Sequence, residues 1–377
     1  MLIKQKHGMR IGDKHYESIW LDKDDDTVVN IIDQSKLPFN FEIFALRTVE
    51  DVFNAIRNMT LRGAPLIGAA AAYGMYLACL EITAYTKTRE HLRNAAKYLI
   101  SARPTAVNLE WAVNRQMEQL SQYCRPDRLI TTSLKTALEI AREEKARCRK
   151  IGEAGLGIIK QLSKNKKGGT VNILTHCNAG WLACIDYGTA TAPIYLAHDK
   201  GIKVHVWVDE TRPRNQGSRL TAWELENHGV PYTLITDNAG GYLMQKGEVD
   251  IVITGSDRTA MNGDTANKAG TYLKALAAKH NNIPFYVALP TSSIDTNIAS
   301  GLNDIPVEKR DEKEVLYVEG LYNNEIVNAR ICPANTRAAN YGFDITPAEL
   351  ITGLITEKGI CRAREEDIRK LLSEKKD

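Results

Sequence analysis

Short apolar segments alternate with helical segments throughout the second half of the chain, and this alternation constrains the fold more than any other feature. Strands alternating with helices of this length form βαβ units, whose parallel sheet carries helices on both faces. We therefore predict a Rossmann-like α/β domain in this half. The predicted strands are 170–175, 203–208, 231–235, 250–254 and 284–289, and the predicted helices are 181–199, 218–228, 239–246 and 267–280.

The first half combines a small β segment with a longer helical region. Thr48, followed three residues later by Asp51, is a good helix start. A charged, glycine-rich segment at 164–169 then separates the halves. We predict an N-terminal β/helical domain over 1–165 and the Rossmann-like domain over 166–377, with a last helix beginning near Thr346. The first half's predicted strands are 15–21 and 27–32, and its helices lie near 64–80, 89–101, 107–122 and 133–162.

The composition is that of a soluble globular protein. A net charge of +3 over 377 residues argues against a dedicated nucleic-acid surface. The longest apolar stretch, Ala64 to Leu80, is interrupted by Pro65 and small residues, which favours a packed helix over a membrane span. Residues 1–12 show no apolar signal segment. The seven cysteines include no CxxC pair, so we expect no disulfide framework, no zinc site and a cytoplasmic location.

A thiol follows the first strand of the second half, in the stretch Leu174 to Trp181. Cys177 stands at this strand end, beside Asn178 and Gly180, just before a predicted helix. The N-terminus of a helix favours anions and would lower the pKa of the thiol. A single cysteine on a strand is, however, more often a small core residue. Both interpretations stay open at this point.

Acidic, amide and basic residues gather at further strand ends and helix starts. Asp257 follows the strand 250–254, and Gln216 lies in a polar segment, 209–219, that is either a solvated loop or an anion site. Lys268 is predicted at a helix start, where it opposes the helix dipole unless an anion lies there. Several cations around one thiol and one acid predict a phosphorylated small molecule. The other candidate anion contacts are Arg62, Gly63, Arg103, Asn267, Arg212, Arg214 and Arg219.

Together these stretches resemble the methylthioribose-1-phosphate isomerase family, which is related to the regulatory subunits of translation factor eIF2B and to archaeal ribose-1,5-bisphosphate isomerase. The resemblance covers nearly the whole chain, in order. The matching segments are Ile32-Asp-Gln-Ser-Lys-Leu-Pro38, Arg62-Gly-Ala-Pro65, Arg103-Pro-Thr-Ala-Val-Asn-Leu109, Thr175-His-Cys-Asn-Ala-Gly180, Asp209-Glu-Thr-Arg-Pro213, Gln216-Gly217, Gly255-Ser-Asp-Arg258, Asn262-Gly-Asp264, Asn267-Lys268, Pro290-Thr-Ser292 and Phe343-Asp-Ile-Thr-Pro347.

The resemblance implies an aldose–ketose isomerase that converts 5-methylthioribose 1-phosphate to 5-methylthioribulose 1-phosphate in methionine salvage. It implies that Asp257 acts as general acid/base and that Cys177 assists proton movement or stabilises the transition state. It further implies that no metal and no organic cofactor is needed, and we expect a homodimer. The substrate contacts that carry over are Arg62, Gly63, Ala64, Arg103, Gln216, Asn267 and Lys268.

Three departures from the family pattern flank the expected site. Trp181 stands where a small residue is usual, Ser256 stands where many members have alanine, and Met261 and Ala269 also replace more usual residues. They leave open 5-deoxyribose 1-phosphate or ribose 1,5-bisphosphate as the substrate. A regulatory protein of the eIF2B type is the alternative from another class. Retention of both Cys177 and Asp257 argues against it, because we expect a non-catalytic relative to have lost that pair.

Overall fold

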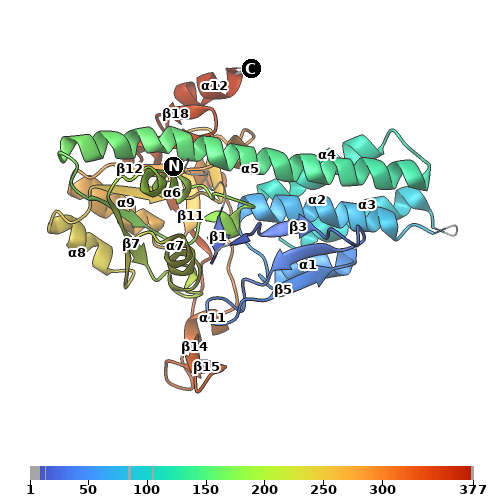
Figure 1. Ribbon diagram of the computed structural model, residues 1–377, viewed down its shortest axis with the longest axis horizontal. Helices are drawn as coiled ribbons and strands as arrows, with labels where there is room; N and C mark the ends of the chain where they lie inside the picture. The colour runs from blue at the N-terminus through green and yellow to red at the C-terminus, as the bar shows by residue number, and fades with distance from the viewer. Residues whose placement is uncertain (1–8, 13, 84–85, 104–105, 375–377) are drawn as a thin grey trace, which may run out of the picture.

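The computed structural model describes residues 9–12, 14–83, 86–103 and 106–374. Residues 1–8, part of the stretch in which we found no signal segment, lie outside the described residues, as does Pro104. Figure 1 shows a helical region beside a region built on a sheet, with one long helix running along both.

The chain begins with small antiparallel β structure, as predicted. β1 (Arg10–Ile11) pairs with β2 (Lys14–His15), and β4 (Val29–Ile32) lies between β3 (Ile19–Leu21) and β5 (Ile43–Leu46). β5 was not predicted, although its four residues are all apolar; three of the four are exposed in the structure. Thr48 caps α1 (Val49–Arg57) in a full capping box with Asp51, which confirms that prediction.

The helical region is built around α2 (Ala64–Leu80), which is buried on every side from Ala64 to Cys79. The predicted helices are confirmed as α2, α3 (Thr88–Ser101), α4 (Val107–Leu120) and α5 (Pro126–Asn165). α5 begins earlier than predicted, because Pro126 is favourable in a first helical turn. No helix in the described ranges is long and apolar enough to cross a membrane.

α5 packs against both parts of the molecule. It contacts α2 and α4 in the helical region, and α6 (Ala192–Asp199) in the sheet region. The domain boundary between residues 165 and 166 stays a prediction.

A seven-stranded sheet confirms the predicted Rossmann-like class. Its spatial order is β18-β17-β12-β9-β6-β7-β8, and every pairing is parallel except that of β17 with β18. All five strands predicted in this half occur in it. The strands are β6 (Val171–Thr175), β7 (Val204–Asp209), β8 (Tyr232–Ile235), β9 (Ile251–Thr254), β12 (Phe285–Ala288), β17 (Gly353–Thr356) and β18 (Gly359–Cys361).

Helices cover both faces of this sheet. Successive residues of β6 point to opposite sides, since Ile173 packs in a core cluster with α6 and α7 (Ala222–His228). Leu174 packs in another cluster with α8 (Ala239–Gln245), α9 (Thr271–His280) and α12 (Glu365–Ser373). A sheet covered on both faces needs strands that are apolar throughout, which explains the continuous apolar runs in the sequence.

Three predicted helices begin at the wrong place. The segment 181–199 holds only a 3-10 turn (Trp181–Ala183) before α6, because Tyr187 lies at φ 63° and Asp186 accepts a hydrogen bond from Met9 N. The segment 267–280 begins as strand β11 (Thr265–Lys268), and Gly270 at φ 111° separates it from α9. Thr346, the predicted helix start, instead pairs with Thr265.

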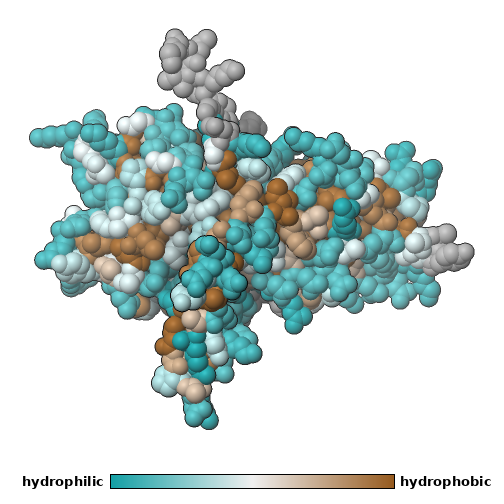
Figure 2. All heavy atoms as spheres, turned by 60° about the horizontal axis from the view of Figure 1, so that its bottom comes forward, coloured by the Kyte–Doolittle hydropathy of each residue, from teal (hydrophilic) through white to brown (hydrophobic). Residues whose placement is uncertain are grey.

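β11 belongs to a second, four-stranded sheet. Its order is β13-β10-β11-β16, formed by β13 (Ile294–Asp295), β10 (Arg258–Ala260), β11 and β16 (Phe343–Thr346). The short helices α10 (Gly301–Asp304) and α11 (Lys313–Leu316) follow β13 along the chain. Beyond α11, the hairpin of β14 (Tyr317–Tyr322) and β15 (Glu325–Arg330) projects from the body (Figures 1 and 2). Its hydrophobic side chains Leu321 and Tyr322 are exposed.

Candidate active site

Cys177 and Asp257 lie at the point where the strand order of the large sheet reverses. From β6 the chain moves outward to β7 and β8, then returns to β9 on the other side of β6. Cys177 follows the carboxyl end of β6, and Asp257 follows that of β9. Ligands of open α/β sheets bind in the crevice at such a switch point.

The backbone of Cys177 is held in an unusual conformation. Its φ is 65°, which a residue with a side chain rarely adopts, and its N–H donates to Thr211 Oγ1 at 2.8 Å. The side chain is only 9% exposed. Burial raises the pKa of the thiol, although the positive charges of Arg62 and Lys268 oppose this effect. Our prediction of a pKa lowered by a helix N-terminus was wrong, because only a single 3-10 turn follows and burial dominates.

Asp257 is a carboxyl group surrounded by cations. Burial raises its pKa, and the charges of Arg103, Arg62 and Lys268 act in the opposite direction. Its backbone N–H donates to Ala266 O at 3.0 Å, which fixes it against the second sheet. The charge of Asp257 also raises the pKa of Cys177. Thiol, acid and three cations therefore share one electrostatic environment.

Arg62 is fixed by the segment that follows Cys177. Its guanidinium donates to Asn178 Oδ1 at 2.5 Å and to Asn178 O at 2.7 Å. The Asn178 amide donates in turn to Glu224, a fully buried carboxyl group that also accepts from the backbone of Trp181 and Leu182. Arg62 is thereby oriented by a continuous buried network, whose members Asn178 and Glu224 were not among the predicted site residues.

Gly63 and Ala64 join Arg62 to the start of α2. Gly63 lies at φ 107°, and a Cβ there would be 2.2 Å from the carbonyl oxygen of Ala183. A side chain is therefore excluded on both conformational and steric grounds. This close approach places the 62–64 turn directly on the 3-10 turn that follows Cys177.

Asn267 and Lys268 reach the site from strand β11 rather than from a helix start. Both are 5% exposed, and burial lowers the pKa of Lys268. The helix-dipole argument for Lys268 was therefore wrong, since the residue pairs with Phe343 of β16. The Asn267 amide donates to Thr271 Oγ1 at 2.9 Å. Lys268 contributes a buried positive charge beside Cys177, and the charge of Cys177 in turn raises its pKa.

Two cavities include residues of this group in their linings. The first is narrow, about 20 Å³ in volume, and its lining surface is mostly apolar. The second is polar and includes Arg62 and Gln216, whose buried Oε1 has no hydrogen-bond partner in the described part of the chain. Ala64, Ile67, Arg103, Ala106, Asp257, Arg258, Ala266, Ile305, Pro306 and Phe343 line the first.

The other arginines of the 209–219 segment hold the C-terminal part of the chain. Arg212 donates to Val315 O, Arg214 pairs with Glu314, and Arg219 pairs with Glu319. Glu314 also pairs with Arg310. The stretch 305–316 thus lies over the site, and its charges act on Arg103 and Lys268. This stretch was not among the predicted site residues, because it carries no strand-end or helix-start signal.

Trp181 and Ser256, two of the departures from the family pattern, make contacts within the fold rather than with the site. Trp181 is 1% exposed and lies in the core cluster against Trp223. Ser256 Oγ is 2.9 Å from Thr259 Oγ1. Neither residue is among those that line the two cavities.

Comparisons with known proteins agree with this geometry. The model of the initiation factor 2 subunit family matches residues 60–363. A methylthioribose-1-phosphate isomerase from Desulfatibacillum aliphaticivorans is 55% identical over 97% of this chain and all of its own length. The crystal structure of 5-methylthioribose 1-phosphate isomerase from Pyrococcus horikoshii OT3 superimposes with a TM-score of 0.82 at 37% identity, covering 96% of this chain and 97% of that one.

A third similar protein has a name from the other functional class. A structure described as translation initiation factor eIF-2B, subunit delta, from A. fulgidus gives a TM-score of 0.78 at 38% identity, covering 95% of this chain and all of that one. The fold alone therefore does not separate the two classes, whereas the identity to the isomerase above is higher over the full length. The chain belongs to the initiation factor 2 subunit family and, within it, to the methylthioribose-1-phosphate isomerase family.

Proposed function

We propose that this protein is an aldose–ketose isomerase that converts 5-methylthioribose 1-phosphate to 5-methylthioribulose 1-phosphate in methionine salvage. The observation that carries the proposal is the placement of Cys177 and Asp257 at the switch point of the sheet, with Arg62, Arg103 and Lys268 around them. An anionic substrate with a neutral reacting carbon suits this arrangement of charges.

The chemistry requires an acid beside the sugar ring. A phosphate ester at C1 prevents the ring from opening freely, so cleavage of the bond between C1 and the ring oxygen needs a proton on that oxygen. Burial raises the pKa of Asp257 and so favours its protonated form, which can donate this proton. One hydrogen then moves from C2 to C1, as a hydride or through an enol, and the C2 hydroxyl becomes the ketone by giving its proton to the Asp257 carboxylate left by the first transfer.

Cys177 is the second group proposed to act on the sugar. Burial keeps its thiol protonated, while Arg62 and Lys268 make release of the proton easier than burial alone would allow. A thiol with these opposing influences is suited to proton movement at C1, C2 or the C2 hydroxyl. Arg62, Gly63, Ala64, Arg103, Gln216, Asn267 and Lys268 are the proposed substrate contacts.

The lining of the first cavity supports a methylthio group at C5. Ile305, Pro306 and Phe343 form its apolar part, and a methylthio group gains by leaving water for such side chains. The same lining includes the guanidinium groups of Arg103 and Arg258, which suit an anion. We therefore place the C5 methylthio group against the apolar side chains.

The test compares three substrates in one assay without added metal. Ketose formation from 5-methylthioribose 1-phosphate, 5-deoxyribose 1-phosphate and ribose 1,5-bisphosphate is followed by proton NMR. Preference for the first is expected. Preference for either of the others would retain the reaction and overturn the substrate, and absence of turnover with all three would favour the regulatory class.

We further propose a cytoplasmic homodimer. All seven cysteines are free, which suits a reducing compartment. Light scattering at micromolar concentration is expected to give twice the chain mass of 42.0 kDa. A monomer mass would contradict the dimer.

A further inference from the structure

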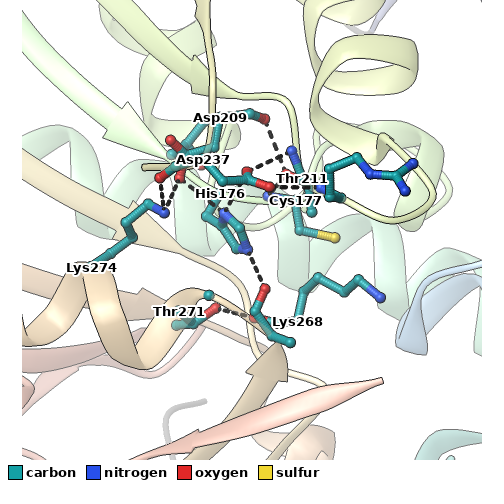
Figure 3. Close-up of polar contacts among 12 residues, drawn as sticks. His176, Cys177, Asp209, Thr211, Asp237, Lys268, Thr271 and Lys274 are labelled. Carbon is teal, nitrogen blue, oxygen red and sulfur yellow. Dashed lines mark hydrogen bonds and ion pairs between the residues drawn. The ribbon is translucent and has the colours of Figure 1, made fainter. Parts of the chain in front are cut away.

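A buried polar cluster lies next to Cys177, and none of its side chains has a role in the proposed reaction. It consists of His176, Asp209, Thr211, Asp237 and Lys274 (Figure 3). The first four come from the carboxyl ends of β6, β7 and β8 or the turns that follow them, and Lys274 comes from α9. The cluster therefore spans three adjacent strand ends and the helix after β11.

The imidazole of His176 connects two parts of the site that are far apart in sequence. Its Nδ1 is 2.9 Å from Asp209 Oδ2, and its Nε2 is 3.0 Å from Ala269 O. Both partners are hydrogen-bond acceptors, so each ring nitrogen faces a fixed acceptor. Cys177 is the next residue along the chain from His176, and Lys268 directly precedes Ala269. One fully buried ring thus joins the segment carrying the thiol to the strand carrying the ammonium.

The remaining members hold the ring and the Cys177 backbone in place. Lys274 Nζ is 3.2 Å from Asp209 Oδ2 and also donates to the carbonyl of Asp237. The Asp237 carboxylate accepts from Thr211 N at 2.7 Å, and Thr211 Oγ1 accepts from Cys177 N at 2.8 Å. Thr211 lies at φ 67° and Cys177 at φ 65°, so two strained residues are fixed against each other.

A glycine provides a second, independent indication that the position of the ring matters. A Cβ at Gly270 would lie 2.9 Å from His176 Cε1 and 3.0 Å from His176 Nε2. Any side chain there would push the ring away from the Ala269 carbonyl. Gly270 also lies at φ 111°, so the turn after β11 is shaped to receive the imidazole.

The cluster has the donor set of a metal site, but its contacts favour another role. Donor atoms of His176, Asp209 and Asp237 lie within 4.8 Å of one another. However, both nitrogens of the ring are already hydrogen-bonded, and the Lys274 ammonium lies against Asp209 where a cation would bind. Lys274 therefore supplies the positive charge that the buried carboxylate needs.

We propose that His176 is a positioning residue that sets the separation between the Cys177 thiol and the Lys268 ammonium. Figure 3 shows these two groups extending to the same side, away from Lys274. With the ring bonded to Ala269 O, the β11 end and the β6 end move as one unit. The inference rests on the proposed function, because it assumes that the thiol and the ammonium contact the same substrate molecule.

Two substitutions separate the contacts of the ring. The amide nitrogen of asparagine can replace Nδ1 and keep the bond to Asp209, whereas that of glutamine reaches the place of Nε2 and keeps the bond to Ala269 O. His176→Asn is expected to lower kcat by roughly 10-fold to 100-fold, the effect of a misplacement of about 1 Å. His176→Gln is expected to recover most of this loss, with melting temperatures of the two variants similar.

Two results would overturn the inference. One is a His176→Asn enzyme with kcat and KM within about twofold of the wild type, and the other is equal impairment of both variants, which would indicate a general structural role. If His176→Asn does not fold, Gly270→Ala displaces the ring while leaving every hydrogen-bonding group present. It should lower kcat in the same way, and an unchanged kcat would contradict the inference.

A measurement that needs no substrate distinguishes failure of the inference from failure of the proposed function. The rate at which iodoacetamide alkylates Cys177, located by peptide mass spectrometry, should change at least severalfold in His176→Asn. An unchanged rate would contradict the inference even if the wild type turned over none of the sugar phosphates. Loss of wild-type turnover after treatment with EDTA, restored by Zn²⁺, would replace the positioning role with a metal site.

Discussion

Two buried regions of this molecule differ in polarity, because one is apolar and the other is rich in polar and charged groups. Helix α2 is buried from Ala64 to Cys79 and packs in a cluster of aliphatic and aromatic side chains. The strand ends at 175–178 and 209–211 are also almost wholly inaccessible, yet they hold a histidine, a thiol, carboxylates and two strained backbones. Apolar burial stabilises the fold in proportion to area, whereas a buried polar network fixes geometry at a cost in stability. The stability contributed by the apolar region thus offsets the cost of the polar region.

The two regions meet where the site needs rigidity. Arg62 and Gly63 immediately precede α2, and the Gly63 backbone lies against Ala183, just beyond the Cys177 segment. Changes in the polar region should therefore affect turnover with little effect on stability, and changes in α2 should do the reverse.

The largest expected effect is on turnover. Cys177→Ser and Asp257→Asn should each lower kcat by roughly 10²-fold to 10⁴-fold, the usual contribution of a general acid or base. Both replacements are close in size to the original side chains, so the melting curves should match the wild type. Steady-state kinetics by proton NMR, with circular dichroism on the same samples, checks this. Near-normal turnover in either variant would refute the assigned role.

In α2 we expect a substitution to lower stability and leave turnover nearly unchanged. Leu77 is fully buried in the apolar cluster, so Leu77→Ala should lower the free energy of unfolding by about 2–5 kcal/mol through lost burial and a residual cavity. Urea unfolding measures the loss. The kcat per folded molecule at 25 °C should stay within about twofold of the wild type. A large fall in kcat with little loss of stability would show that the comparison between the regions is wrong.

The buried carboxyl of Glu144 on α5 gives the comparison a pH dependence. Burial raises the pKa of Glu144 on α5 to about 7, despite its ion pair with Arg147. A carboxyl whose pKa is higher in the folded state contributes stability that is fully present below its unfolded value of 4.5. That stability is lost as the pH rises through about 7.

The matched variant is Glu144→Gln, which keeps the shape and does not titrate. Between pH 5 and pH 8 the wild type should lose roughly 2–3 kcal/mol of unfolding free energy relative to this variant. Urea titrations at four pH values across that range provide the difference directly. A difference that is constant with pH would mean that Glu144 stays ionised in the folded protein.

The parts of the fold that were predictable from sequence are those with a local signal. Each strand predicted for the parallel sheet in the second half is a short apolar run in the sequence. Cys177, Asp209 and Asp257 follow or end these runs and can be recognised from the sequence alone. Because parallel strands present their carboxyl ends at one edge, the sequence was enough to gather these groups at one site. The resemblance to a family added the substrate contacts on several other elements.

What could not be predicted depends on contacts between distant segments. Lys268 lies on a strand because β11 pairs with β16, whose residues follow more than 70 positions later. The pKa of Cys177 depends on burial under several elements, while local sequence suggested only the opposing effect of a helix start. The stretch 305–316 is held over the site by Arg212 and Arg214 through tertiary contacts that no local pattern encodes.

The smallest expected effect concerns Ser256, which lies at the border of the polar region. Its hydroxyl is bonded to Thr259, and Thr259 lies 3.0 Å from Thr265 Oγ1, so the contact joins β10 and β11 rather than reaching either cavity. Ser256→Ala should therefore cost about 1 kcal/mol of stability, the net value of one hydrogen bond. The ratio of kcat/KM among the three sugar phosphates should not change. A shift in that ratio toward ribose 1,5-bisphosphate or 5-deoxyribose 1-phosphate would show that this hydroxyl senses the C5 substituent, and would extend the functional region beyond the strand ends into the second sheet.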